Sequence, residues 1–107
     1  MAKEFNVENW DQEVLQNSGV TVVDFWAEWC GPCRVFTPIV EQLSEKMADR
    51  ASVGNLNVDQ NSDIASDSGI RGIPTVIIYK GGKEVQRKSG VIQLAELENM
   101  VEQAINL

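Results

Sequence analysis

The sequence contains no histidine and only two cysteines, and both scarcities restrict the chemistry open to it. Without histidine, no side chain titrates near neutral pH at its ordinary pKa, and no Ser-His or Cys-His catalytic arrangement can form. Two cysteines without histidine also leave a tetrahedral structural zinc site with half of its preferred ligands. Any catalysis must therefore depend on thiols or carboxylates, and we expect no bound metal.

Cations and long apolar runs are also scarce. Nine Lys and Arg stand against sixteen Asp and Glu, and the formal net charge of -7 would repel nucleic acids and anionic membranes. No segment approaches the about 18 consecutive apolar residues typical of a membrane-spanning helix, and the first residues do not resemble a signal peptide. We therefore expect a cytoplasmic protein without nucleic-acid or membrane partners, or an organellar one if a transit peptide was removed.

The chain has 107 residues, a length that predicts a single domain over residues 1–107. Its apolar spacing predicts a mixed α/β architecture. The run VTVVDFW at residues 20–26 is β-branched and aromatic throughout, which is typical of a central strand buried on both faces. Gly81 and Gly82 favour a hairpin turn between the last two strands. The other strands are expected around residues 3–5, 53–59, 74–79 and 84–90.

Helices are predicted where apolar residues recur at i, i+3, i+4 and i+7. Asn6 can cap the first helix, whose inner face would be Val7, Trp10 and Val14. Residues 61–69 predict a short, weak helix. Two longer helices carry one apolar face each: Phe36, Ile39, Val40, Leu43 and Met47 in the first, and Leu94, Leu97, Val101, Ala104 and Ile105 in the last.

Both cysteines lie in one short motif, in which Gly31 and Pro32 separate Cys30 from Cys33. Because a strand precedes this motif and a helix follows, the two thiols fall in the first turn of the helix. There, unpaired backbone N–H groups and the positive end of the helix dipole stabilise a thiolate and so activate the thiol. Pro32 suits the turn because its missing N–H would have no helical partner.

Three interpretations of the cysteine pair are open: redox exchange, a static staple or inert thiols, and metal binding. Residues three apart in a helical turn are close enough for a disulfide that opens and closes without refolding. A staple that closes so short a loop would stabilise little, because the entropy removed from the unfolded chain grows with loop length. We therefore favour reversible dithiol–disulfide exchange.

Three segments of the sequence resemble the thioredoxin family: VDFWAEWCGPCRVFTPIVEQL, NVDQN and GIRGIPTVIIYKGG. The resemblance runs along essentially the whole chain. It implies a thioredoxin fold, with a central mixed five-stranded sheet flanked by four helices. It also implies a protein-disulfide reductase that carries electrons without a bound cofactor, acts on disulfide-containing proteins and is recycled by a separate thioredoxin reductase. We expect the protein described by this sequence to be a monomer.

The resemblance also implies roles for residues of the motif and the strand before it. Cys30 would be the exposed nucleophile that attacks a substrate disulfide, and Cys33 would resolve the resulting mixed disulfide. The pair Gly31 and Pro32 accompanies reducing members of the family and would tune the redox chemistry. Asp24 is a carboxylate in an apolar strand, so burial should raise its pKa, and it would accept a proton from Cys33. The alternative for Asp24 is a strand-end residue that reaches water.

One position departs from the family pattern. Many thioredoxins carry a lysine just before the leucine of the third strand, near the buried aspartate, whereas this chain has Asn55. Without that cation the ionised form of Asp24 loses an attractive interaction. We therefore expect a higher Asp24 pKa than in a relative that retains the lysine.

Family members place a cis-proline opposite the cysteines, at a motif matched here by GIPT. Residue types alone favour a trans bond, but the resemblance implies a cis Ile73–Pro74 bond and pairing of an extended substrate segment with the backbone of Ile73. A flat, mostly apolar surface around Cys30 would then accept many protein substrates. Ordinary core and turn packing is the alternative for its members, which are Trp29, Gly72, Ile73, Pro74, Gly90 and Val91.

Two other functions fit such a domain. An oxidase or isomerase of disulfides is disfavoured by the missing export signal and by the Gly31 and Pro32 pair. A binding module with incidental thiols would not require both cysteines together with Asp24 and Pro74. An insulin-reduction assay separates the binding module from the redox enzymes, and the equilibrium with glutathione separates reductant from oxidant.

Overall fold

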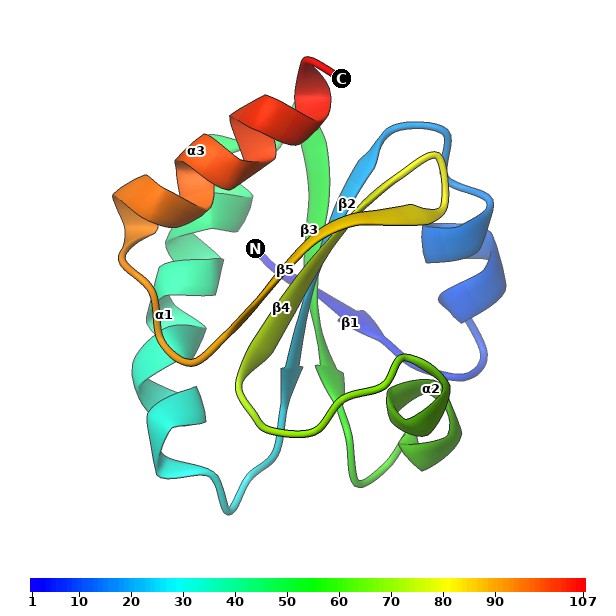
Figure 1. Cartoon of the computed structure of the whole chain (residues 1–107), viewed down its shortest axis with the longest axis vertical. Helices are drawn as coiled ribbons and strands as arrows, with labels where there is room; N and C mark the ends of the chain where they lie inside the picture. The colour runs from blue at the N-terminus through cyan, green and yellow to red at the C-terminus, as the bar shows by residue number, and fades with distance from the viewer.

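A mixed five-stranded sheet forms the centre of the computed structural model, which describes all 107 residues (Figure 1). Its strands are β1 (Lys3–Phe5), β2 (Val20–Trp26), β3 (Ala51–Asn57), β4 (Thr75–Lys80) and β5 (Lys83–Ser89), in the spatial order β1-β3-β2-β4-β5. β1, β3 and β2 run parallel, whereas β4 and β5 each pair antiparallel to their neighbour. The predicted sheet is confirmed.

Four helical segments flank this sheet: η1 (Asp11–Leu15), α1 (Gly31–Lys46), α2 (Ser62–Asp67) and α3 (Leu94–Ile105). The helices α1 and α3 cover one face together, while η1 and α2 lie on the other side (Figure 1). None of them combines the length and hydropathy that a bilayer crossing requires.

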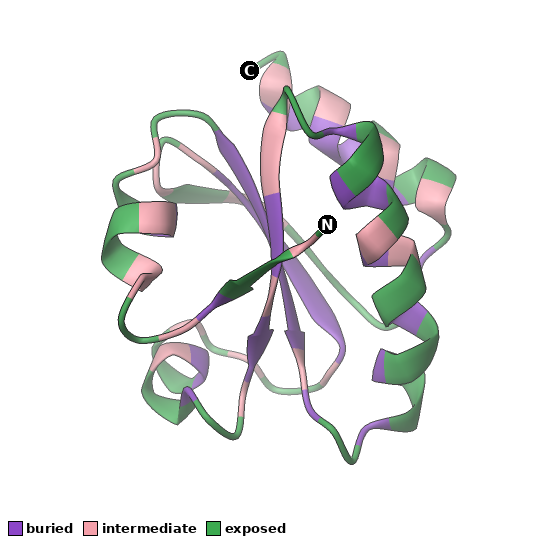
Figure 2. Cartoon of the chain, turned by 180° about the vertical axis from the view of Figure 1, so that it is seen from behind, coloured by how far each residue is buried: buried purple, intermediate pink, exposed green.

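Strand β2 is buried on both faces, as its continuous apolar run predicts (Figure 2). Because side chains alternate along a strand, Val20 and Val22 pack in the core beneath α1 and α3. Val23 and Phe25 pack in the opposite core, beneath η1 and α2. Burying each of these side chains stabilises the fold by roughly 1.5–3 kcal/mol, so β2 anchors both layers.

The first helical segment differs from its prediction. The expectation that Asn6 caps this helix is wrong, because its N-cap is Trp10, which makes no side-chain capping bond. The Oδ1 of Asn6 instead accepts the backbone N–H groups of Glu8 and Asn9 in the turn before the helix. The expectation that Val7 lies on the inner face is wrong, because Val7 is 60% exposed. The regular part begins only at Asp11 and is a π-helix, in which the repeat is wider than the spacing assumed from the sequence.

The third strand begins and ends two residues earlier than predicted, at Ala51 and Asn57. Its end has a clear cause. The side-chain oxygen of Asn57 accepts the backbone N–H groups of Asp59 and Gln60, and this local bonding turns the chain away from the sheet.

The hairpin turn between β4 and β5 is formed by Gly81 and Gly82 as predicted. Their φ angles of +61° and +79° lie in the left-handed region that glycine adopts without strain. At Gly82 there is also no room for a side chain, because an added Cβ would collide with the carbonyl oxygen of Leu15.

The topology brings three loops to one edge of the sheet. The parallel strands β2 and β3 end there, at Trp26 and Asn57, and the antiparallel strand β4 begins there, at Thr75. The segment after β2 leads into the cysteine motif at the start of α1. This edge is therefore where the sequence-predicted site residues can meet.

Candidate active site

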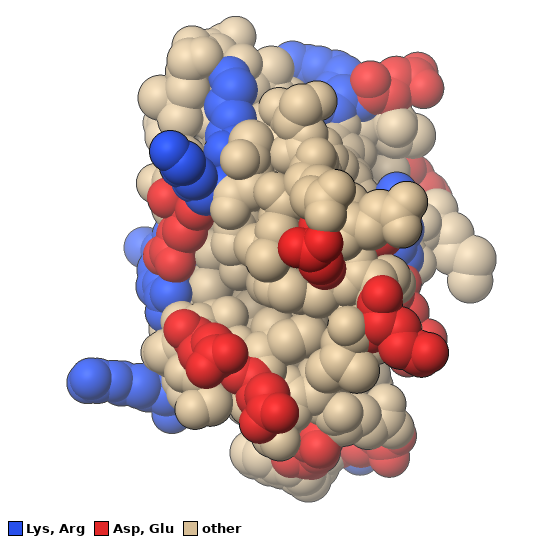
Figure 3. Space-filling model, turned by 90° about the vertical axis from the view of Figure 1, so that its right-hand side faces the viewer, with Lys and Arg blue, Asp and Glu red and all other residues tan.

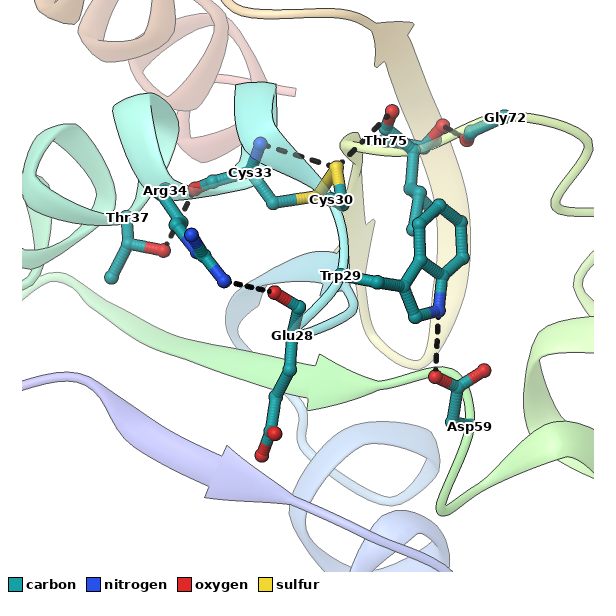
Figure 4. Close-up of a disulfide and its surroundings, with 10 residues drawn as sticks. Glu28, Trp29, Cys30, Cys33, Arg34, Thr37, Asp59, Gly72 and Thr75 are labelled. Carbon is teal, nitrogen blue, oxygen red and sulfur yellow. Dashed lines mark hydrogen bonds between the residues drawn. A yellow bond between two sulfur atoms is a disulfide. The ribbon is translucent and has the colours of Figure 1, made fainter.

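Cys30 and Cys33 form a disulfide at the start of α1 (Figure 4). Their Cα atoms lie 5.3 Å apart, within the range that a disulfide requires. Cys30 is the N-cap residue of the helix, and its Sγ accepts the backbone N–H of Cys33 at 3.2 Å. The helix therefore directs an unpaired backbone donor and its positive dipole end at the sulfur of Cys30.

The expectation that Cys30 is exposed is wrong for the disulfide form. Cys30 is only 4% exposed and Cys33 is fully buried. Both pack against Ala27 in a small cluster that Val58 and Ile73 partly cover, and this cover was not foreseeable from the motif. Cys30 is still the only one of the two that solvent reaches.

The Ile73–Pro74 segment lies directly against the disulfide. Its peptide bond is cis, as predicted. The Sγ of Cys30 lies 3.7 Å from the carbonyl oxygen of Ile73. In the disulfide this sulfur has no hydrogen to donate, but the reduced thiol can donate one to that oxygen.

Trp29 presents an exposed aromatic ring next to the cysteines, with 70% of its surface accessible. Its indole Nε1–H donates to Asp59 Oδ2 at 2.8 Å (Figure 4). No sequence motif singled out Asp59, although it follows the end of a parallel strand, where functional side chains collect. The ring is therefore held in place from a second loop.

Two further hydrogen bonds stabilise the start of α1, and neither was predictable from the cysteine motif. The guanidinium of Arg34 donates to the backbone carbonyl of Glu28 at 2.8 Å, and the hydroxyl of Thr37 donates to the backbone carbonyl of Cys33 at 2.9 Å. The first ties the loop before the helix to the first turn of α1, and the second joins two successive turns of α1 itself (Figure 4).

Asp24 lies fully buried in the middle of β2, and neither carboxylate oxygen has a hydrogen-bond partner. Burial raises its pKa from 3.8 to about 7, because the charged form loses its hydration. The predicted direction is confirmed, and the alternative of a strand-end residue in contact with water is wrong. By strand alternation its side chain points to the face covered by α1 and α3, as does that of Val22.

Asn55 is the neighbour of Asp24 on β3, since the two residues are paired in the parallel register. The side-chain oxygen of Asn55 is buried without a partner, as are both oxygens of Asp24. No cation therefore offsets the burial of the carboxylate from this position.

Replacing Asn55 by lysine is expected to lower the pKa of Asp24 by about 1 unit or more, because a nearby cation favours the ionised carboxylate. Carboxyl NMR titration of the N55K variant measures this directly. An N55M variant, with a side chain of similar length and no charge, is the matched control and should show no such decrease. An unchanged or raised pKa in N55K would contradict the argument.

A mostly apolar groove of about 480 Å³ lies beside Trp29. The segment of residues 70–73 forms one part of its lining, Val58 another, and α2 contributes the remainder. The groove thus brings together three of the predicted surface residues. Gly90 and Val91 do not line it; Gly90 instead donates its backbone N–H to the carbonyl of Pro74 at 2.8 Å.

Acidic side chains gather on the part of the surface near α2 (Figure 3). Asp63 and Asp67 belong to this helix, and both are exposed. Because charges at the surface act over about a Debye length, a partner that approaches from this side meets a negative potential.

Known proteins of similar sequence match nearly the whole of this chain. The thioredoxin family profile matches residues 1–103. A thioredoxin of Rickettsia felis is 37% identical over 105 residues, which is 98% of this chain and 100% of the relative. A thioredoxin of Rhodospirillum rubrum is 38% identical over 96% of this chain and 99% of its own length. A chloroplastic M-type thioredoxin of Chlamydomonas reinhardtii is 38% identical over 94% of this chain and 72% of its own length.

Proposed function

This chain belongs to the thioredoxin family, and from that premise we propose the order in which its two cysteines react. The chain is a thiol–disulfide oxidoreductase that reduces disulfides through the pair Cys30 and Cys33, without a bound cofactor. Within this activity, Cys30 attacks and Cys33 resolves. The observation that carries this order is that Cys30 is 4% exposed whereas Cys33 is 0% exposed.

The first step forms a mixed disulfide. The thiolate of Cys30 attacks one sulfur of the substrate disulfide, so that a bond between Cys30 and the substrate forms while the substrate S–S bond breaks. The departing substrate sulfur leaves with the electron pair and takes up a proton. The N–H of Cys33 and the N-terminus of α1 support the attacking anion, because both place positive charge at the sulfur of Cys30.

The second step releases the substrate. The thiolate of Cys33 attacks the sulfur of Cys30, the mixed disulfide breaks, and the disulfide between the two cysteines forms. Two electrons have then passed from the dithiol to the substrate, whose second sulfur leaves as a thiolate and is protonated.

Asp24 is the proposed acceptor of the Cys33 proton. Two observations support this role: its carboxylate has no competing hydrogen-bond partner, and burial raises its pKa to about 7. A base with a pKa near the working pH is present in its unprotonated form and still binds a proton well. Gly31 and Pro32, between the cysteines, are the proposed redox-tuning residues.

The proposed substrate surface surrounds the sulfur of Cys30. Support comes from the exposed ring of Trp29, from the apolar groove beside it and from the backbone of Ile73, whose N–H makes no hydrogen bond within the chain. An extended substrate segment can pair with that free backbone, which favours broad specificity because backbone groups are common to all substrates. The proposed substrate surface consists of Trp29, Gly72, Ile73, Pro74, Gly90 and Val91.

Family membership also implies the classes of partner: proteins that carry disulfides, and a thioredoxin reductase that restores the dithiol. A monomer without nucleic-acid or membrane partners stays a prediction. A cytoplasmic location is likewise proposed, supported by bacterial relatives named simply thioredoxin, while the Chlamydomonas relative is named chloroplastic.

The order of attack is tested by trapping the first intermediate. In a Cys33→Ser variant the mixed disulfide cannot be resolved, so reaction with insulin should leave a covalent adduct through Cys30, visible by mass spectrometry and lost on reduction. A Cys30→Ser variant is the matched control and should form no adduct. An adduct of equal yield in both variants, or in the Cys30→Ser variant alone, would overturn the assigned order.

A further inference from the structure

Two hydroxyl groups meet behind the loop that lies against the active-site sulfur. Thr75 begins β4 and Ser89 ends β5, and the two residues face each other in the antiparallel register. The hydroxyl of Thr75 donates to the backbone carbonyl of Gly72 at 2.5 Å and lies 3.2 Å from the hydroxyl oxygen of Ser89. Thr75 is 2% exposed, whereas Ser89 lies at the surface.

The number of hydroxyl hydrogens determines which residue is the donor in each of these hydrogen bonds. A threonine hydroxyl has a single hydrogen, and that of Thr75 is used on the carbonyl of Gly72. The contact between the two hydroxyls can then form only with Ser89 as the donor. Ser89 therefore fixes the rotation of the Thr75 hydroxyl, and Thr75 fixes the Gly72 carbonyl.

Residues 72–73, which these hydrogen bonds hold in place, are otherwise weakly constrained. Gly72 has open space where a Cβ would lie, and glycine samples more backbone conformations than any other residue. The N–H of Ile73 makes no hydrogen bond, and its carbonyl contacts the Sγ of Cys30 at 3.7 Å. Arg87 of β5 donates to the carbonyls of Ser68 and Gly69 at the start of this loop, and Gly90 N–H donates to the carbonyl of Pro74 at its end. Residues 72–73 between them have only the bond from Thr75 and the contact with Cys30.

From this geometry we infer that Thr75, oriented by Ser89, is a positioning residue that sets the backbone of residues 72–73 for pairing with an extended protein substrate. The inference rests on the proposed substrate surface and adds to it the residues that hold its edge in place. The two hydroxyls bond to the carbonyl of Gly72 and to each other, and neither makes a hydrogen bond to a cysteine sulfur. Loss of the Thr75 hydroxyl should therefore slow the reduction of protein substrates selectively, because a small disulfide has no segment to pair with the loop.

The test compares two substrates in Thr75→Val, which keeps the shape of the side chain and removes the hydroxyl. Insulin is the protein substrate and 5,5′-dithiobis(2-nitrobenzoic acid) is the small disulfide. The ratio of kcat/KM for insulin to the rate constant for the small disulfide should fall about five- to tenfold, as expected for a backbone alignment set by one hydrogen bond. The loss should lie in KM, and Thr75→Ser should restore the ratio.

A surface variant keeps the inference testable if Thr75→Val folds poorly. Ser89→Ala leaves no buried cavity and should lower the same ratio about two- to threefold, since it frees only the rotation of the Thr75 hydroxyl. An unchanged ratio in both variants, or equal losses for the two substrates, would overturn the inference. Failure of the wild-type protein to reduce either substrate would instead overturn the proposed function, so the two failures are distinguishable.

Discussion

Replacing Asp24 by asparagine is expected to raise the free energy of unfolding by about 4 kcal/mol at pH 8. The pKa of Asp24 rises from 3.8 to about 7 on folding, and each pKa unit corresponds to about 1.4 kcal/mol. Because the folded protein binds the proton more tightly, the wild type loses stability as the pH rises above about 4. The loss is complete above about pH 7, where the buried carboxylate is charged. Asparagine cannot ionise and avoids this loss.

Urea unfolding between pH 4 and pH 8 checks this expectation. The advantage of the D24N variant should be small at pH 4 and should grow with pH through the window between the two pKa values. An Asp49→Asn variant is the control, because Asp49 is exposed and its replacement should change stability little at either pH. A constant difference between D24N and the wild type across the whole range would contradict a raised pKa.

Replacing Cys30 by serine is expected to reduce the rate of insulin reduction to the background set by dithiothreitol, a loss of at least about 100-fold. A serine hydroxyl is not ionised at neutral pH and cannot form the mixed disulfide, so the N–H groups and dipole at the start of α1 have no anion to stabilise. Precipitation of the reduced insulin B chain provides the measurement.

The Cys33→Ser variant is the informative comparison for this loss. It should also fail in the steady state, because the mixed disulfide is not resolved, but in a single turnover it should still release one thiolate from a chromogenic disulfide. The Cys30→Ser variant should release none. Substantial turnover by Cys30→Ser would mean that Cys33 can attack unaided, and would remove the distinct roles of the two cysteines.

The sequence predicted the features that depend on local pattern. The continuous apolar run of β2 identified a strand buried on both faces, and a carboxylate within that run identified Asp24 as buried with a raised pKa. The strand before the cysteine motif and the helical spacing after it placed the cysteines at a helix start, where the structure shows the sulfur of Cys30 capping α1. Each of these properties is determined by neighbours in the sequence.

The features that the sequence did not predict depend on contacts between distant segments. The bond from Trp29 to Asp59 spans 30 positions and becomes apparent only when the ends of β2 and β3 meet. Part of the cover over Cys30 comes from Ile73, a residue 43 positions away. The π-helix was missed for another reason, since its wider repeat does not give the spacing used to recognise an α-helix.

The capping of α1 by a reactive sulfur couples the chemistry to the folding of the helix. In the disulfide the capping atom is neutral, whereas in the reduced protein it can be an anion, which interacts more strongly with the first peptide groups. Every catalytic cycle therefore strengthens and then weakens the same terminal turn. Fraying of that turn removes the N–H groups that stabilise the thiolate and so lowers its nucleophilic reactivity. Substitutions that loosen the beginning of α1 therefore act on catalysis even when they leave both cysteines in place.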